Sequence, residues 1–173
     1  MKKIRKWIEP LNAGKYNEIV KSFHEETDRA AGILAGAFVE HYLKDFLRTF
    51  LKKDTVVDEL FDAPFAPLST FAARAKLAYA MNLISNDSLK DLDIIRAIRN
   101  HFAHHPVDTS FKNAEVAGLC AELSTAKSQD AAGLKRSSRE SYLFAVGMAV
   151  GRMHNAKLKY EQRNLRGERL TNG

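Results

Sequence analysis

The stretch DSLKDLDIIRAIRNHFAHH, from Asp87 to His105, has the pattern of an amphipathic helix. At 100° per residue its large apolar side chains fall on one face. These side chains are Leu92, Ile94, Ile95, Ile98 and Phe102. Pro106 follows directly and disfavours helical geometry at His105. The sequence therefore predicts a largely buried central helix that ends at His104.

The polar side chains of this helix form a second pattern. Arg96, Asn100 and His104 follow one another at a spacing of four on the side opposite the apolar face. Arg99 lies at the edge of the apolar face, where a guanidinium must be paired or must reach solvent along its stem. On an ideal helix about 140° separates Arg99 from His104, so the two residues are not stacked neighbours.

The N-terminal half of the chain also has helical periodicity. Residues 15–52 contain no proline, and apolar residues recur at three and four, which predicts one long helix or two joined near Thr27–Asp28. The segment DAPFAP, with two prolines, predicts a loop. Ser69 or Thr70 can then cap a helix that runs to about Leu83.

The C-terminal half predicts a short helix around residues 113–123 and a long one from Ser138 to about Gln162, with a polar connection between them. No strand pattern is evident. We therefore expect an all-α, single-domain helical bundle, in which two long helices form the frame and shorter helices cross them. The expected divisions are a basic N-terminal arm (1–14), the helical domain (15–163) and a flexible tail (164–173).

Glycines at a spacing of four occur in both long helices. They are Gly32 and Gly36 in the first, and Gly147 and Gly151 in the second. Glycine inside a helix costs up to about 1 kcal/mol relative to alanine. The repeated spacing predicts that the two long helices cross closely, although glycines that are merely tolerated remain an alternative.

The composition indicates which partners and which cellular compartment to expect. The net charge of +6 makes an acidic partner such as nucleic acid plausible, and basic residues concentrate near both ends of the chain. Cys120 is the single cysteine, so no intrachain disulfide can form, and we expect a buried thiol in a reducing cytoplasm. The basic start MKKIRKWIEP lacks the apolar stretch of a signal peptide, and no apolar run approaches the about 20 residues that span a bilayer.

Three interpretations of the histidine cluster stay open. The histidines can finish a helix, where cationic groups interact favourably with the helix dipole. His101 and His105, at i and i+4, could share a metal with His104 or His41 as a third ligand. An arginine and a histidine could also act on RNA, because a guanidinium holds phosphate oxygens and an imidazole moves a proton.

The segment RNHFAH, Arg99 to His104, resembles the R-x4-H motif of the HEPN superfamily of small helical, often dimeric proteins, which includes metal-independent endoribonucleases and toxins. This resemblance implies that Arg99 holds the scissile phosphate, that His104 is the acid or base, and that Asn100 orients one of them. Arg96, His101 and His105 are the expected binding residues around this site. The resemblance also implies a homodimer, whose interface would form the cleft.

A longer stretch, Leu60 to Pro106, resembles the signature block of the mannitol operon repressor (MtlR/YggD-type) family, and AGILAGAFVEHYLKDFL upstream is similar to that family's long helix. The resemblance covers residues 28–111. It implies a helical transcriptional regulator of sugar-alcohol uptake that acts by binding, without a helix-turn-helix and without a cofactor or metal. The expected partners are a second copy of the chain and either nucleic acid (DNA or RNA) or a regulatory protein. A HEPN-type ribonuclease and a plain protein-interaction module are the alternatives.

Overall fold

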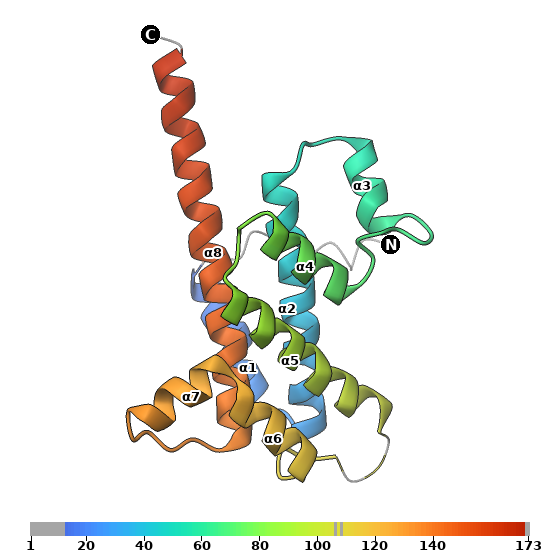
Figure 1. Cartoon of the computed structure of the whole chain (residues 1–173), viewed down its shortest axis with the longest axis vertical. Helices are drawn as coiled ribbons and strands as arrows, with labels where there is room; N and C mark the ends of the chain where they lie inside the picture. Colours follow the sequence, from blue (N-terminus) through green and yellow to red (C-terminus); the bar gives the residue numbers. More distant parts are fainter. Residues whose placement is uncertain (1–12, 106, 108, 172–173) are drawn as a thin grey trace.

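The structure, a computed structural model, describes residues 13–105, 107 and 109–171 (Figure 1). Within these residues the chain forms eight helices and no strand, which confirms the all-α class. The expected basic arm lies mostly outside the described residues. The helices are α1 (Ala13–Glu25), α2 (Asp28–Phe50), α3 (Thr55–Asp62), α4 (Phe71–Ala80), α5 (Asn86–His104), α6 (Ala114–Glu122), α7 (Ser124–Ala131) and α8 (Ser138–Thr171).

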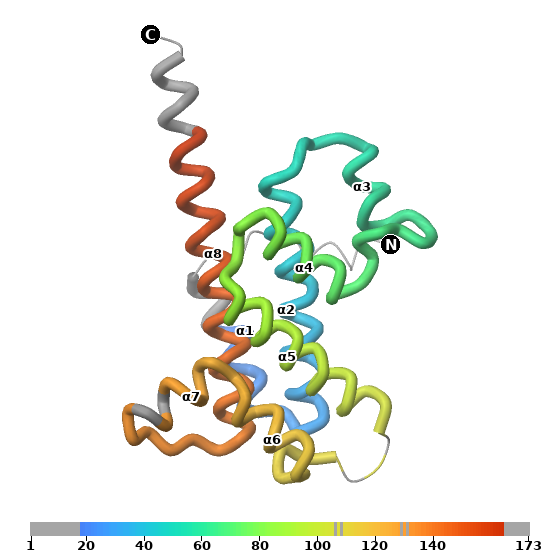
Figure 2. Tube along the Cα trace, viewed as in Figure 1, coloured from blue at the N-terminus to red at the C-terminus, as the bar shows by residue number. Residues whose placement is uncertain are grey.

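The two long helices α2 and α8 form the frame of the bundle, as predicted. They pack against each other, and α5 packs against both. Figure 1 shows α5 crossing in front of α2 and α8, with α6 and α7 at one end of the bundle and α3 and α4 towards the other. Figure 1 also shows the C-terminal half of α8 extending beyond the other helices, and the Cα trace in Figure 2 shows the same arrangement of the bundle.

The central helix α5 begins and ends where the sequence predicts. The hydroxyl of Ser85 accepts a hydrogen bond from the backbone N–H of Ser88 (3.2 Å), which caps the helix start. His105 has extended backbone geometry and ends the helix. Four predicted core residues are buried: Leu92, Ile95, Ile98 and Phe102.

The first helical segment is two helices rather than one. Thr27 caps α2 by accepting a hydrogen bond from the backbone N–H of Ala30 (3.3 Å). Arg139, near the start of α8, binds the connection between α1 and α2. Its guanidinium donates to Asp28 (2.6 Å) and to the carbonyl oxygens of Phe23 (3.1 Å) and Glu26 (2.5 Å). The arginine thus caps the end of α1 and orients it against α2.

Other helix ends follow local signals. Thr70 caps α4 as predicted, but α4 ends at Ala80, before the expected Leu83, and Asn82 adopts a left-handed φ of 57°. Asn113 caps α6, and Leu123 ends it, close to the predicted bounds. Ser137 and Glu140 form a capping box at the start of α8, and the Ser137 hydroxyl, as the largest cause, lowers the pKa of Glu140.

Three segments differ from the sequence prediction. The polar connection expected as a loop contains α7, because Asp91 of α5 accepts hydrogen bonds from the backbone N–H (2.8 Å) and hydroxyl (2.5 Å) of Ser124, the first residue of that helix. Helix α3, which was not expected, is capped by Asp54. Helix α8 continues past Gln162 to Thr171, so residues 164–171 are helical. Flexibility of the tail stays a prediction.

The glycines of α2 do mark a close approach, but to α5 rather than to a glycine face of α8. A Cβ at Gly32 would overlap the ring of Phe102, and one at Gly36 would lie 2.6 Å from Cβ of Arg99. A Cβ at Gly151 would meet nothing within 4 Å. The predicted pairing of glycine faces was therefore wrong at Gly151. Helix α8 instead contributes Tyr142, whose hydroxyl donates to the Gly32 carbonyl oxygen (2.8 Å).

Cys120 is buried in the core, as predicted, and burial raises the pKa of its thiol to about 12. Such a thiol is almost entirely protonated near neutral pH and is a poor nucleophile. Along the described part of the chain, no helix combines the length and the apolar character needed to cross a membrane.

Candidate functional site

Arg99, the arginine of the R-x4-H motif, is held in an ion-pair network between α5, α2 and α4. Its Nη2 donates to Oε2 of Glu40 (2.5 Å), and the other oxygen of Glu40 lies 3.7 Å from Nη1 of Arg74. The side chains of Arg99 and Glu40 are each 24% exposed. The expectation that Arg99 must be paired or reach solvent is confirmed, and its partner is Glu40.

Arg74 extends this network into the loop before α4. It is buried, and it donates from Nε to the carbonyl oxygen of Leu68 and from Nη2 to that of Ser69, both at 2.7 Å. One carboxylate, Glu40, thus faces two guanidinium groups, and the other contacts of Arg74 hold the backbone before α4. A network with this connectivity stabilises the crossing of α2, α4 and α5.

The other two motif residues, Asn100 and His104, are not part of the ion-pair network of Arg99. His104 is exposed at the last residue of α5, and Asn100 is half-buried. Arg99 instead points towards α2. Within the described chain, no hydrogen bond or ion pair joins Arg99 to His104. The structure therefore places the three predicted catalytic residues on one helix but does not bring them into one cleft within a single chain.

The expected binding residues have partners at the end of α5. The rings of His101 and His105 stack at 4.2 Å between centroids, and Nδ1 of His101, which is buried, lies 3.4 Å from a carboxylate oxygen of Glu115. That contact has an ion-pair distance without hydrogen-bond geometry. Arg29 donates to the carbonyl oxygen of His105 (3.1 Å), which satisfies a group at the helix end.

Arg96, the remaining expected binding residue, pairs with Asp93 one helical turn earlier on the same surface (3.3 Å). Such exposed pairs contribute little to stability. Among the described residues, no three His, Cys, Asp or Glu side chains are grouped so that they could hold a metal ion.

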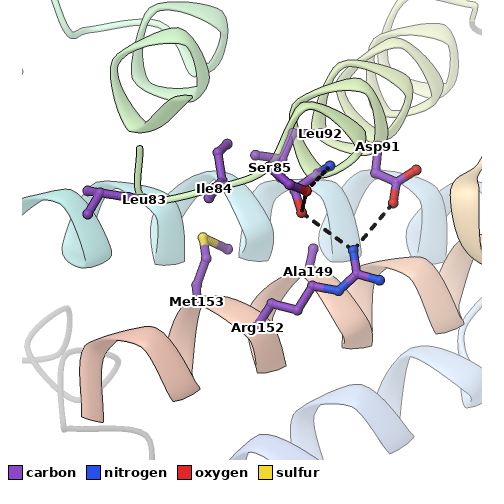
Figure 3. A pocket seen from close by; sticks show the side chains of 9 residues that line it. Leu83, Ile84, Ser85, Asp91, Leu92, Ala149, Arg152 and Met153 are labelled. Atoms are coloured by element: carbon purple, nitrogen blue, oxygen red, sulfur yellow. Dashed lines mark hydrogen bonds and ion pairs between the residues drawn. The ribbon is translucent and has the colours of Figure 1, made fainter. Parts of the chain in front are cut away.

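A pocket of about 250 Å³ lies between the N-terminal end of α5, the segment before it, and α8. In Figure 3, Arg152 and Met153 point from α8 towards Leu83, Ile84 and Asp91 across this space. One part of the lining is apolar and the other is polar. The lining residues are Leu83, Ile84, Ser85, Ser88, Asp91, Leu92, Ala149, Arg152 and Met153.

Arg152 is the cationic group of this pocket. Its Nη1 lies 3.5 Å from the Ser88 hydroxyl and 3.9 Å from Oδ2 of Asp91, both long contacts, and its side chain is 44% exposed. The sequence prediction did not include Arg152 or the pocket. The available signal was weak: an arginine directly after the apolar run YLFAVGMAVG, between the core residues Val150 and Met153.

Comparison with known proteins identifies the protein family of the chain. A protein-family model described as mannitol repressor matches residues 16–158, which run from α1 into α8. Among solved structures, the fold is similar to that of MtlR from Escherichia coli in a crystal structure of the MtlR–HPr complex. The TM-score is 0.65 at 17% sequence identity, over 80% of this chain and 97% of that one. No curated protein matches the chain.

Proposed function

Because the chain belongs to the mannitol repressor family, we propose that it is a regulator of sugar-alcohol uptake genes that acts by binding a protein partner, and not by catalysis. The family match includes most of every helix that forms the bundle. The regulator works in the cytoplasm, where the genes and their regulatory proteins are found.

The ion pair between Arg99 and Glu40 is the observation that carries this proposal. A guanidinium that holds a scissile phosphate must attract that anion, whereas Arg99 donates a short hydrogen bond of 2.5 Å to the carboxylate of Glu40, whose negative charge repels a phosphate. Its Cβ also packs where Gly36 leaves room, so the position of Arg99 is part of the crossing of α2 and α5. The motif arginine thus serves the fold, which favours binding over RNA cleavage.

The proposed partner is an HPr-type protein. This proposal extends to the present chain what the E. coli structure records for its own MtlR, a complex with HPr. Partner binding also accommodates the absence of a recognisable helix-turn-helix in the sequence. Regulation through a protein partner requires no element that reads base edges.

Titration calorimetry of the full chain with the HPr protein encoded in the same genome tests this proposal. We expect saturable binding with one HPr per chain, and no heat above dilution for a control protein of similar size and charge. An absence of binding at low and at physiological salt would contradict the proposed partner. A parallel titration with operator DNA must weaken steeply as salt rises if phosphate contacts drive it.

We also propose that the chain forms a homodimer. The polar side chains Arg96, Asn100 and His104 line one side of α5, and the last of them is exposed at the helix end. A second copy could pair with this polar surface. Static light scattering at micromolar concentration should give about twice the chain mass of 19.4 kDa, and a 19.4 kDa particle would contradict the dimer.

The second candidate function is a HEPN-type, metal-independent ribonuclease. The exposure of His104 favours it, because an accessible imidazole can exchange protons with a substrate. This function would require Arg99 to leave Glu40, or a second copy to supply another arginine near His104. A protein that acts only by binding leaves RNA intact, whereas a ribonuclease of this type cleaves RNA without a metal.

A further inference from the structure

We propose that the pocket between α5 and α8 is a binding site for a short-chain carboxylate, with the carboxylate on Arg152 and the hydrocarbon chain against the apolar wall. The volume of about 250 Å³ is suited to a small molecule. An apolar cavity of about 150 Å³ already accepts a benzene ring. This site is separate from the ion pair of Arg99 and does not depend on the proposed protein partner.

One wall of the pocket is lined by apolar side chains. It consists of five side chains from the segment before α5, from α5 itself and from α8. They are Leu83, Ile84, Leu92, Ala149 and Met153. Leu92 and Met153 are each 2% exposed and form the floor, while the other three are half-buried. A hydrocarbon chain on this wall removes further apolar surface from water, which is the main source of affinity for such pockets.

The polar side of the pocket has donors that are not fully used. Arg152 has five N–H groups, and its contacts of 3.5 Å to Ser88 and 3.9 Å to Asp91 are longer than a normal hydrogen bond. Its side chain is long and partly exposed, so it can turn towards a ligand. The hydroxyls of Ser85 and Ser88 line the same side. A carboxylate can therefore accept a bidentate pair of hydrogen bonds from the guanidinium.

Asp91 lies 3.9 Å from Arg152, the distance of a long ion pair, and its shorter contacts are to another helix. Its two oxygens accept the hydrogen bonds from the backbone N–H and hydroxyl of Ser124. Ser124 begins α7, so the positive end of that helix also lies against the carboxylate. A ligand carboxylate that accepts short hydrogen bonds from Arg152 would replace this long contact, and an anion with an apolar tail fits both sides of the pocket.

Methyl NMR of the full chain, titrated with sodium hexanoate and separately with hexanamide, tests the site. The two probes have the same hydrocarbon chain and differ in charge. We expect hexanoate to shift the methyl signals of Met153 and Ile84 saturably, with hexanamide weaker by about tenfold or more. No saturable shift with hexanoate, or equal affinity for both probes, would overturn the proposal.

Substitutions distinguish the contribution of the Arg152 charge to binding from the contribution of the space in the pocket. Arg152→Gln should weaken hexanoate by about tenfold or more and leave hexanamide unchanged. Arg163→Gln removes the same charge from α8 about 16 Å further along the helix and should leave both probes unchanged. Ala149→Leu fills the pocket without a change of charge and should abolish binding of both. Undiminished hexanoate binding in Arg152→Gln or in Ala149→Leu would overturn the assignment.

Discussion

The two ends of α5 border very different surroundings. Its C-terminal half packs on α2 so closely that Gly32 and Gly36 leave no room for a Cβ. Its N-terminal end borders an open pocket against α8. One arginine from each region can be compared. Arg99 has a 2.5 Å bond to Glu40, whereas Arg152 has only contacts of 3.5 Å or longer.

The difference shows that the surroundings of an arginine decide what it can bind. Arg99 lies in a segment that resembles a motif associated with RNA cleavage, yet it pairs with Glu40. Arg152 belongs to no motif, yet its donors face a cavity. Both arginines lie at the edge of apolar surfaces, and only the three-dimensional partners distinguish them. Substitutions that perturb one end of α5 and not the other test this comparison.

The largest effect is expected from Phe102→Ala at the closed end. Phe102 is fully buried and packs against Gly32 and Phe111. The substitution should lower the free energy of unfolding by about 3–5 kcal/mol. Phe65→Ala is the matched control, because Phe65 is fully exposed, and it should change stability by less than about 0.5 kcal/mol. Denaturant unfolding checks both, and a loss below about 1 kcal/mol for Phe102→Ala would contradict the core assignment.

A methyl group added at the α2–α5 crossing should be the next most damaging change. In Gly32→Ala the new Cβ would overlap the Phe102 ring, and we expect a loss of about 1–3 kcal/mol despite the better helix propensity of alanine. Gly151→Ala on α8, where the added Cβ meets nothing, should gain up to about 1 kcal/mol. Thermal or denaturant unfolding of both variants measures the contrast. Equal effects of the same sign would mean that α2 and α5 do not cross as closely as described.

Removal of the charge on Glu40 should have a smaller effect. Glu40→Gln keeps the size of the side chain but leaves Arg99 and Arg74 facing a neutral group, at an expected cost of about 1–2 kcal/mol. Asp93→Asn removes the partner of Arg96 at the surface and should cost less than about 0.5 kcal/mol. If both variants unfold at the same denaturant concentration, Arg99 is not held by Glu40 in solution.

The sequence predicted what depends on local signals. Helix α5 has regular apolar periodicity, a serine cap and a following proline, so its bounds and buried face could be predicted without tertiary information. Helix α7 has no such signal. Its first residue is held by Asp91, 33 positions earlier in the chain, and a contact of that range is not encoded locally.

The candidate sites were less predictable for the same reason. That Arg99 needed a partner followed from its place at the edge of the apolar face, but Glu40 became identifiable only with the packing of α2. The pocket at Arg152 depends on which helix lies opposite the start of α5. Neither the spacing of Ser85 and Ser88 nor the position of Arg152 in its own helix contains that information.

The proposal that the protein acts by binding, with Arg99 part of the fold, is best tested by an RNA cleavage assay. The assay compares the wild-type protein with His104→Ala, with and without EDTA. His104 is exposed, so the variant should keep the fold, which an unchanged circular dichroism spectrum would verify. If Arg99 serves the fold and the protein acts by binding, both proteins will leave a mixed RNA substrate equally intact. Cleavage by the wild type in EDTA that leaves 2′,3′-cyclic phosphate ends and is lost in His104→Ala would contradict this account.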